Sequence, residues 1–538
     1  MICQVICAYV SPLRRHWQSL SVKLSCRGVY TSPQVAVTLR SAHASMFSVS
    51  QTDGKARTGT LTARQGEVAT PAALIYTFRG SPLNLTPDLL ESLGPDARMM
   101  HLDASQFVES PGPEVLRKFG GGAHNFFALQ NCTLVASARD PMAYGIQRWR
   151  SGSPDGIRIT THSGHQQLSV TRYLEVVGAL APDYFAALSD EVPSVKVDHR
   201  RAALSVDRTL AWLDQCLGAQ GSSAVLASIQ GSSYDFERQR CAAEAAKRLG
   251  VAGFSLAGLG SGESREKRAA LMEAATAELP SHLPRYLLAG AGTPEDALDA
   301  MAAGVDFIDG SYAVRAASAG AALLLRKSDR GQAGLQGVDH AETTHSAVSQ
   351  PAPMSPRISP RHSGQPWRRA SPEAAAQKEH SRKEPERHAS ESQESSFVLN
   401  SESAGCSSGE LAPSATEQKP SFVHEVGTRG KSSRSPGTAE EWDSDDTTIS
   451  LHSERFRRDT GPLSRGCPCH TCLRHTRAYI HHLLNVNEML AEVLLEIHNS
   501  RNYLDFFADA RRAISAGRFV DFRQAFLNRR SLRYSNAA

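Results

Sequence analysis

The chain lacks several features that would point to common classes of protein. No apolar run among its 538 residues reaches the roughly 18 residues that a membrane-spanning helix needs. Seven of its ten cysteines are scattered without a pairing pattern, which argues against a disulfide framework. No G-x-G-x-x-G segment follows an early strand, which disfavours a dinucleotide-binding fold. The sequence therefore predicts a protein of a reducing compartment without an integral membrane segment.

Acidic residues are absent from positions 1–52, where five basic residues are spread among Ser, Thr and Val. This composition is typical of a mitochondrial presequence. An equally open interpretation is a spurious extension upstream of a true start at Met46. The predicted location is the cytoplasm, with the mitochondrial outer membrane as a peripheral site.

Aromatic residues are few in 326–460, which is rich in Ser, Pro, Glu, Arg, Gln and His. Such a segment cannot bury enough apolar surface to offset its chain entropy. We therefore predict a disordered insert, with Ser-Pro positions as candidate phosphorylation sites. The net charge of +4 permits contact with nucleic acid but does not demand it.

What is present in 70–325 is an alternation of apolar, β-prone runs with amphipathic stretches. This alternation predicts parallel βα units, and their number over this length favours an α/β fold of the (βα)8 barrel type. The expected strands are 183–189, 224–229, 251–257, 285–290 and 304–308. The expected helices are 199–216, 234–249, 264–277 and 294–303.

Three cysteines, Cys467, Cys469 and Cys472, form a C-x-C-x2-C motif at the start of the ordered segment 461–538. Three thiols this close can converge on one ion, and a fourth ligand would close a tetrahedral Zn²⁺ site with a structural role. His498 is the preferred fourth ligand, because apolar spacing predicts one long helix over 474–499 that carries it. Zn²⁺ is therefore the expected cofactor, one per chain.

Four other histidines compete with His498 for the fourth position. His470 and His475 are crowded by the thiols, and His481 and His482 are expected on the surface of the same helix.

Polar residues follow several of the predicted strands, where a barrel presents its functional side chains. Asp309 follows the strand at 304–308 and could be a nucleophile, although an Asp that caps the next turn is the simpler interpretation. Asp190, Gln230 and Gly258 follow three other strands and could line a pocket for a purine edge. The competing interpretation is ordinary loop chemistry, in which Asp and Gly are common.

The tail after the cysteines is basic, with aromatic residues between its arginines. It could rest on a phosphate backbone, or it could be the solvated face of C-terminal helices. The basic residues are Arg501, Arg511, Arg512, Arg518, Arg523, Arg529, Arg530 and Arg533, and the aromatic ones are Tyr503, Phe506, Phe507, Phe519 and Phe522.

Taken in order, these segments resemble the queuine/archaeosine tRNA-guanine transglycosylase family. The resemblance rests on Gln230-Gly231, AGLGSGE (257–263), LLAGAGTPED (287–296), GVDFID (304–309) and the cysteine motif with His498. It implies a (βα)8 barrel with a zinc subdomain, and exchange of guanine for a deazaguanine at the wobble position of tRNA. In the family, one Asp attacks the ribose and a second, in a DSGGFQ motif, serves as acid or base.

The chain departs from the family pattern where the catalytic residues belong. Asp309 occupies the nucleophile position but is followed by GSYAVR, and DSGGFQ is replaced by a segment that begins at Asp140. Ala257 stands where the family has the first of two glycines. Asp190, Gln230 and Gly258 match base-contacting positions and are interpreted as vestiges.

Two segments, 205–217 and 465–484, resemble the eukaryotic accessory-subunit branch of the family. The resemblance implies a non-catalytic subunit that binds tRNA and forms a heterodimer with the catalytic queuine tRNA-ribosyltransferase subunit, the zinc subdomain helping to form the interface. Two alternatives stay open: a divergent active transglycosylase that uses Asp309 with Asp140 or Asp190, and a zinc-stabilised tRNA-binding scaffold.

Overall fold

A computed structural model describes residues 47–142, 152–193, 197–219, 221–288, 292–326, 442 and 446–531. The chain divides into two compact units, and all of these residues lie in the first, 1–333 with 432–538. In this part of the chain, every helix is too short or too polar to cross a membrane.

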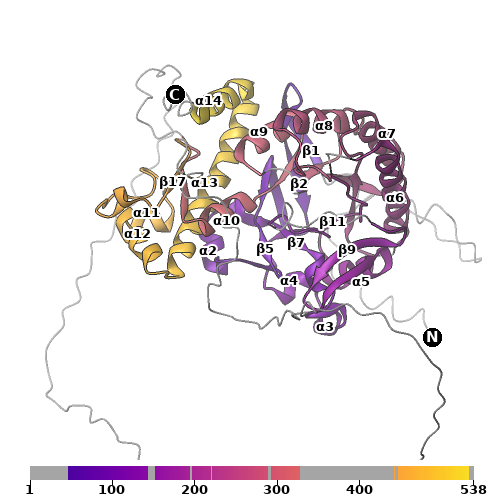
Figure 1. The fold of residues 1–538 in the computed structure, drawn as a ribbon, viewed down its shortest axis with the longest axis horizontal. Helices are drawn as coiled ribbons and strands as arrows, with labels where there is room; N and C mark the ends of the chain where they lie inside the picture. The colour runs from indigo at the N-terminus through magenta and orange to yellow at the C-terminus, as the bar shows by residue number, and fades with distance from the viewer. Residues whose placement is uncertain are drawn as a thin grey trace, which may run out of the picture. The chain divides into compact units, whose positions relative to one another are not determined.

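Eight parallel strands form the central sheet (Figure 1). In sheet order they are β4 (Ala72–Leu74), β15 (Phe307–Asp309), β14 (Arg285–Leu287), β13 (Val251–Leu256), β12 (Ala224–Ile229), β11 (Tyr184–Ala186), β8 (Thr133–Ser137) and β7 (Met99–Asp103). A parallel bridge between Ile75 and Met100 joins the two edges. The sheet thus closes into a barrel, and the predicted fold class is confirmed.

Helices follow the strands and form the outer layer. They include α5 (Val170–Leu180), α6 (His199–Gly218), α7 (Asp235–Ala246), α8 (Arg265–Ala277), α9 (Pro294–Ala302) and α10 (Ser311–Ser318). Several begin at a residue whose side chain accepts a hydrogen bond from the first turn, as Asp198 does from the Arg201 N–H at 2.8 Å. Such caps fix where each helix leaves the rim of the barrel.

Short elements fill the connections around β7 and β8. Before β7 lie β5 (Thr77–Phe78), β6 (Ser81–Pro82), α2 (Pro87–Ser92) and the 3-10 turn η1 (Pro95–Arg98). Between β7 and β8 lie η2 (Ala104–Phe107), α3 (Gly112–Phe119) and α4 (Gly122–Phe126), and the hairpin β9 (Gly156–Thr161) and β10 (Gly164–Ser169) precedes α5.

An antiparallel sheet precedes the barrel, and the sequence did not predict it. Its strands are β1 (Phe47–Asp53), β2 (Ala56–Ala63) and β3 (Gly66–Thr70). Phe47 and Leu61 pack into one buried cluster with barrel residues, and Arg57 is paired with Asp306 at 2.6 Å. The folded region therefore begins before residue 70, and the boundary drawn at residue 52 falls inside β1.

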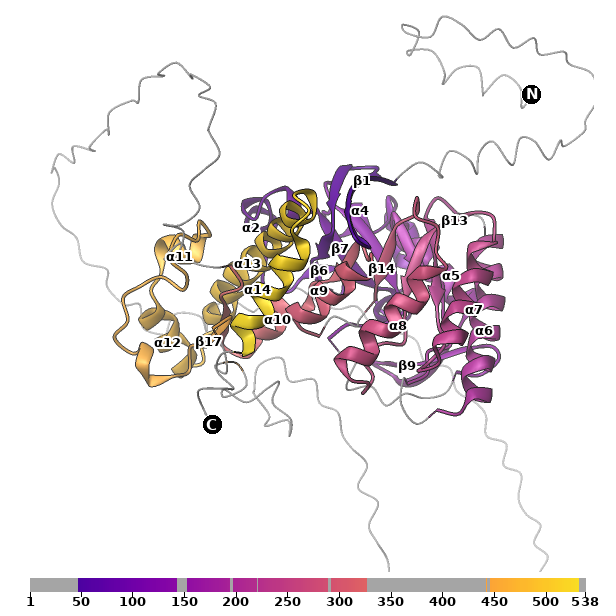
Figure 2. The ribbon, with the colours of Figure 1, turned by 90° about the horizontal axis from the view of Figure 1, so that it is seen from above.

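The C-terminal segment packs against the barrel within the same unit. It contains α11 (His470–Arg474), α12 (Arg477–Asn485), α13 (Leu490–Ser515) and α14 (Phe519–Ser531). Helix α13 contacts β1, β2 and β4 as well as α10. Figure 2 shows α13 and α14 between the barrel and the lobe formed by α11 and α12.

Two predictions about the C-terminal part of the chain are wrong. The expected single helix 474–499 is interrupted, because α12 ends at Asn485 and Asn487 adopts a positive φ of 56°. Strand β17 (Thr448–Ser450) and the 3-10 turn η4 (Glu454–Phe456) lie within the predicted insert. Strand β17 pairs with β16 (Ala321–Leu323), which precedes the insert. Most of 326–460, and the proposed Ser-Pro sites in it, lie outside the described residues.

Candidate functional site

The four predicted metal ligands converge in the structure. The ligand atoms of Cys467, Cys469, Cys472 and His498 all lie within 4.8 Å of one another. His498 Nδ1 is 3.7, 3.6 and 3.3 Å from the three sulfur atoms in that order. A tetrahedral ion with the usual Zn–S and Zn–N bond lengths would separate nitrogen and sulfur by about 3.6 Å. The group therefore fits a tetrahedral metal ion.

The local sequence explains how the thiols gather. Gly466 has a φ of 77° and turns the chain into the motif. Cys469 is the N-cap of α11, and its sulfur accepts a hydrogen bond from the Cys472 N–H at 3.4 Å. The Thr471 hydroxyl donates to the Leu494 carbonyl at 2.7 Å, which fixes α11 against α13. The motif is thus held against the helix that carries the histidine.

The second ring nitrogen of His498 has its own partner. Nε2 lies 2.8 Å from the carbonyl oxygen of Leu323 in β16. That hydrogen bond places the proton on Nε2 and leaves the Nδ1 lone pair facing the thiols, as a metal ligand requires. The cluster therefore links the motif, α13 and the strand that follows the barrel.

The competing histidines have other surroundings. His470, His475 and Tyr479 form a row of rings with centroids 5.8 and 5.4 Å apart. His481 was expected on the surface but is buried, with Nδ1 2.8 Å from the Leu451 carbonyl oxygen. His482 is exposed, as expected.

Asp309 ends β15 at the carboxyl-terminal rim of the barrel, where the sequence placed it. Its two oxygens accept from the Ser311 N–H at 3.0 Å and from the Ser311 hydroxyl at 2.6 Å. This is the capping arrangement that the sequence offered as the simpler interpretation. The pKa of Asp309 is raised above its usual value, mainly by burial. The hydrogen bonds from Ser311 oppose this shift, and the Asp140 carboxylate adds to it.

Asp190 is fully buried and bound by two arginines of α6. Arg201 lies 2.7 Å from one of its carboxylate oxygens and Arg208 lies 3.1 Å from the other. Gly152 backs the same carboxylate, since a Cβ at that position would lie 2.6 Å from Asp190 Oδ1. The carboxylate is therefore enclosed by the protein and is not presented to a ligand.

Gln230 and Gly258 lie together, as the predicted pocket requires. A Cβ on Gly258 would come within 2.5 Å of Gln230 Oε1, and the φ of Gly258 is 65°. Gln230 is fully buried, and neither polar atom of its amide has a hydrogen-bond partner among the described residues. Its neighbour Ala257 is also buried.

Three further residues at this rim have notable contacts or pKa shifts, and the sequence analysis did not single them out. Arg238 of α7 donates to the carbonyl oxygens of Ala257 and Gly258 at 3.1 and 3.0 Å and to that of Ser232 at 2.9 Å, and so joins the loops after β13 and β12. Burial, with a smaller contribution from Asp140, raises the pKa of Asp103 to about 7. Burial and a hydrogen bond to Asp140 raise the pKa of Tyr76. The signal for Asp103 was available, since it directly follows the mostly apolar segment 99–102.

The basic tail is tied to the rest of the chain. Arg511 pairs with Asp96, Arg523 with Asp299 and Arg530 with Glu295. Arg529 donates to the carbonyl oxygens of Leu324 and Leu325 at 2.8 and 2.9 Å. Most of the interleaved aromatic residues are buried core: Tyr503, Phe506, Phe507 and Phe519. These arginines are therefore engaged within the fold, and the aromatic residues between them are core rather than a solvated face.

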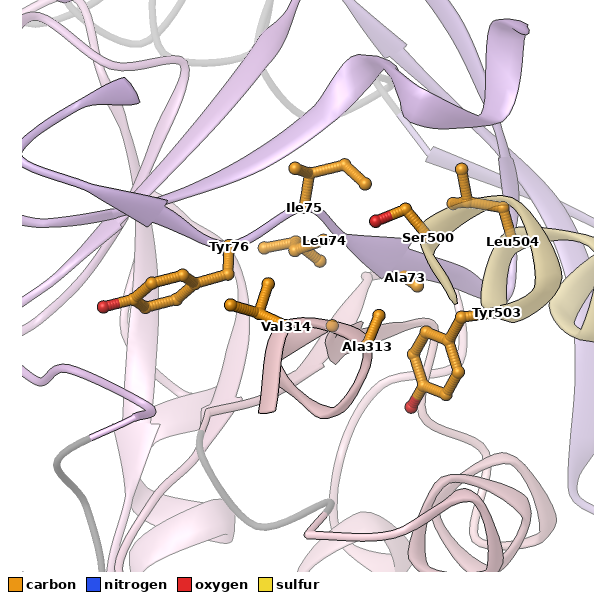
Figure 3. A pocket seen from close by; sticks show the side chains of 10 residues that line it. Ala73, Leu74, Ile75, Tyr76, Ala313, Val314, Ser500, Tyr503 and Leu504 are labelled. Carbon is orange, nitrogen blue, oxygen red and sulfur yellow. The ribbon is translucent and has the colours of Figure 1, made fainter. Parts of the chain in front are cut away.

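A small cavity lies where α13 meets β4 and α10 (Figure 3). It measures about 10 Å³, about enough for one water molecule. In the view, the Tyr76 ring points away from Ser500, Tyr503 and Leu504 of α13. A larger hollow of about 400 Å³ lies between α2, η1 and the loop before β8. It is at the amino-terminal end of β7 and β8, opposite the rim that carries Asp190 and Asp309.

Comparison with known proteins gives one consistent result. The family model "Queuine tRNA-ribosyltransferase" matches residues 52–352 and 420–532. A Xenopus tropicalis protein named queuine tRNA-ribosyltransferase accessory subunit 2 is 29% identical over 482 residues, covering 88% of this chain and 96% of the relative. The Homo sapiens protein of that name is 28% identical over 463 residues, covering 84% and 91%. A Thermus thermophilus queuine tRNA-ribosyltransferase is 26% identical over 488 residues, covering 90% and 94%.

Proposed function

The chain belongs to the queuine tRNA-ribosyltransferase family, and we propose that it is the non-catalytic accessory subunit of a heterodimeric enzyme. That enzyme exchanges guanine for queuine at the wobble position of tRNA, and this chain supports tRNA binding and assembly. The observation that carries the proposal is the enclosure of Asp190 by Arg201 and Arg208. A carboxylate at a base-contacting position has to be free to accept N–H groups, and this one is already engaged.

The donor set supports zinc as the ion of the Cys467–Cys469–Cys472–His498 group. Three thiolates and one imidazole in a closed tetrahedron are typical of structural zinc. Cys467, Cys469, Cys472 and His498 would hold the ion. They would fill all four coordination positions and leave none open for water or substrate. The ion would supply stability to the lobe and no chemistry at the barrel rim.

Exposed apolar residues of the metal lobe support a protein partner. Five large apolar side chains are exposed around α11, α12 and the start of α13: Leu473, Tyr479, Val486, Met489 and Leu490. Exposed apolar groups indicate an interaction surface when they form one patch, and these five come from successive elements of one lobe. The proposed partner is the catalytic subunit of the same family.

Native mass measurement of the co-expressed pair, with metal analysis, tests this assembly. We expect a 1:1 heterodimer with one zinc in this chain. Met489→Glu should weaken the pair, because Met489 is 74% exposed in the proposed interface. Leu249→Glu is the matched control, since Leu249 is 86% exposed on another part of the chain, after α7. A chain that remains alone in the presence of the catalytic subunit would contradict the proposal.

A second candidate is a divergent active transglycosylase. It is favoured by the acidic groups at the rim, where burial raises the pKa of both Asp309 and Asp103 and the charge of Asp140 adds to the shift. Asp309 would then be the nucleophile, and a second carboxylate, Asp140 or Asp190, the acid or base. The Ser311 hydrogen bonds to Asp309 and the arginines around Asp190 count against it.

The proposed location is the cytoplasm, with peripheral attachment to the mitochondrial outer membrane. The basic, acid-free segment 1–52 supports an association with mitochondria. Fractionation of cells that express the full chain or a form starting at Met46 tests this. If both forms distribute equally between the cytoplasmic and mitochondrial fractions, the segment does not direct the protein to mitochondria.

A further inference from the structure

Three aromatic side chains lie together at the rim of the barrel. His199 is the first residue of α6, Tyr234 is the N-cap of α7, and Phe236 is the second residue of α7. These helices follow the adjacent strands β11 and β12. Their N-termini therefore start from the same end of the barrel as Asp190 and Gln230, the end where barrel proteins bind their ligands.

The three rings contact one another mostly through their edges. Their centroids are 5.5 Å apart for His199 and Tyr234, 5.1 Å for His199 and Phe236, and 5.7 Å for Tyr234 and Phe236. The interplanar angles are 62°, 55° and 65° in the same order. Because no pair is stacked, no ring lies flat over another. Phe236 is 53% exposed and the His199 side chain 54%, so open ring surface faces solvent.

The platform is held in place by polar contacts. His199 Nε2 lies 2.8 Å from a Glu237 oxygen, and the Tyr234 hydroxyl donates to the Val197 carbonyl at 3.1 Å. These contacts hold the His199 and Tyr234 rings in place, and the exposed ring surface is what a ligand could use. Rings fixed in advance lose little side-chain entropy when a ligand binds.

Acidic and basic side chains both lie beside the platform. Asp235 pairs with Lys267 at 2.9 Å, and Glu237 pairs with both His199 and Arg240. Arg200, next to His199, is exposed. Asp198, next to His199, is exposed, and Arg240 is shared by Glu237 and Asp207. The ring faces, and not a local positive field, would therefore supply the affinity for a base.

We propose that His199, Tyr234 and Phe236 form a stacking platform for an unpaired base of the bound tRNA. Aromatic faces accept any base by stacking, and such platforms are typical of proteins that hold single-stranded nucleic acid. This inference rests on the proposed function, because it takes tRNA as the ligand of the complex. It adds a contact that needs neither a free Asp190 nor a base inside the barrel.

Phe236→Ala in the full chain, co-purified with the catalytic subunit, tests the platform. We expect the Kd for tRNA to rise by about 5- to 100-fold, which is the range for loss of one stacked base. The dependence of Kd on salt should not change, because the substitution removes no charge. Phe236→Trp should keep the wild-type affinity, since it keeps a ring face.

Phe119→Ala is the matched control, because Phe119 is 61% exposed on α3 and belongs to a different aromatic group. An unchanged Kd for Phe236→Ala in an intact complex would overturn the platform while leaving the accessory role in place. Dissociation of the two subunits in this variant would show that the rings bind protein and would overturn it as well. Failure of the wild-type pair to bind tRNA would instead contradict the proposed function itself.

Discussion

Arg201 donates a hydrogen bond to Asp190 at 2.7 Å, and Asp190 is the residue that we interpret as the vestige of a base-contacting carboxylate. Arg208 engages the second oxygen, so the Asp190 carboxylate acts within the fold. The pair explains how the chain can keep an acidic residue from the family pattern and still have no free recognition group there.

Asp190→Asn should destabilise the protein by about 2–4 kcal/mol. It removes the charge that two arginines share in a buried site, and breaking such a pair from one side is costly. The free energy of unfolding in urea measures the effect. Asp207→Asn is the control, because the Asp207 side chain is 62% exposed and pairs with Arg240 at the surface. An equal loss of unfolding free energy in the two variants would show that the buried Asp190 pairs stabilise the fold no more than a surface pair does.

Cys469→Ser should release the metal ion and lower the midpoint of thermal unfolding by on the order of 10 °C. The substitution removes one of four ligands and frees α11 from α13. Metal content and thermal unfolding are measured on the same sample. Cys132→Ser should change neither, because this half-buried thiol lies outside the cluster. Full metal content in Cys469→Ser would mean that Cys469 is not a ligand.

Asp103→Asn should change how stability depends on pH. Burial raises the pKa of Asp103 from 3.8 to about 7, so the folded state holds a proton that the unfolded state has lost. Its contribution to stability is present below about pH 4 and is lost as the pH rises to about 7. The wild type should therefore lose on the order of a few kcal/mol more than the variant between pH 5 and pH 8. Identical pH profiles in urea unfolding would contradict this.

Arg523→Gln should loosen α14. The Arg523 guanidinium shares the buried Asp299 carboxylate with Arg265, which ties the last described helix to the barrel. We expect faster amide exchange in 519–531, corresponding to about 1 kcal/mol of local stability. Arg512→Gln, which removes a surface pair with Asp509, should leave that exchange unchanged. No difference between the two variants would show that the pair does not hold the helix.

The sequence predicts the barrel and the metal ligands because both depend on local pattern. Apolar runs gave five of the barrel strands, and the three cysteines lie within six residues of one another. The contact of His498 Nε2 with Leu323 joins positions 175 residues apart, so no spacing rule reveals it. The same holds for Arg57 and Asp306, which attach the unexpected sheet to the barrel.

The sequence did not predict the break in the helix at 474–499 or the arginines around Asp190, and both errors have a similar cause. Apolar spacing continues across Asn487, so only the positive φ of that residue shows that one helix stops before the next begins. From the sequence, Arg201 and Arg208 are expected to be exposed residues of an amphipathic helix. In the structure both pair with the buried Asp190. Sequence pattern could place Asp190 at the rim of the barrel, and it could not show that the carboxylate was already occupied.

Guanine exchange into tRNA by the chain alone, by the catalytic subunit alone and by the co-purified pair is the most direct test of the accessory role. Each preparation is incubated with tRNA and labelled guanine, and the pair is also tested with Asp309→Asn. For an accessory subunit we expect no exchange by this chain alone and an unchanged rate for the pair that carries Asp309→Asn. Robust exchange by the chain alone, or loss of activity when an intact pair carries Asp309→Asn, would contradict the accessory role.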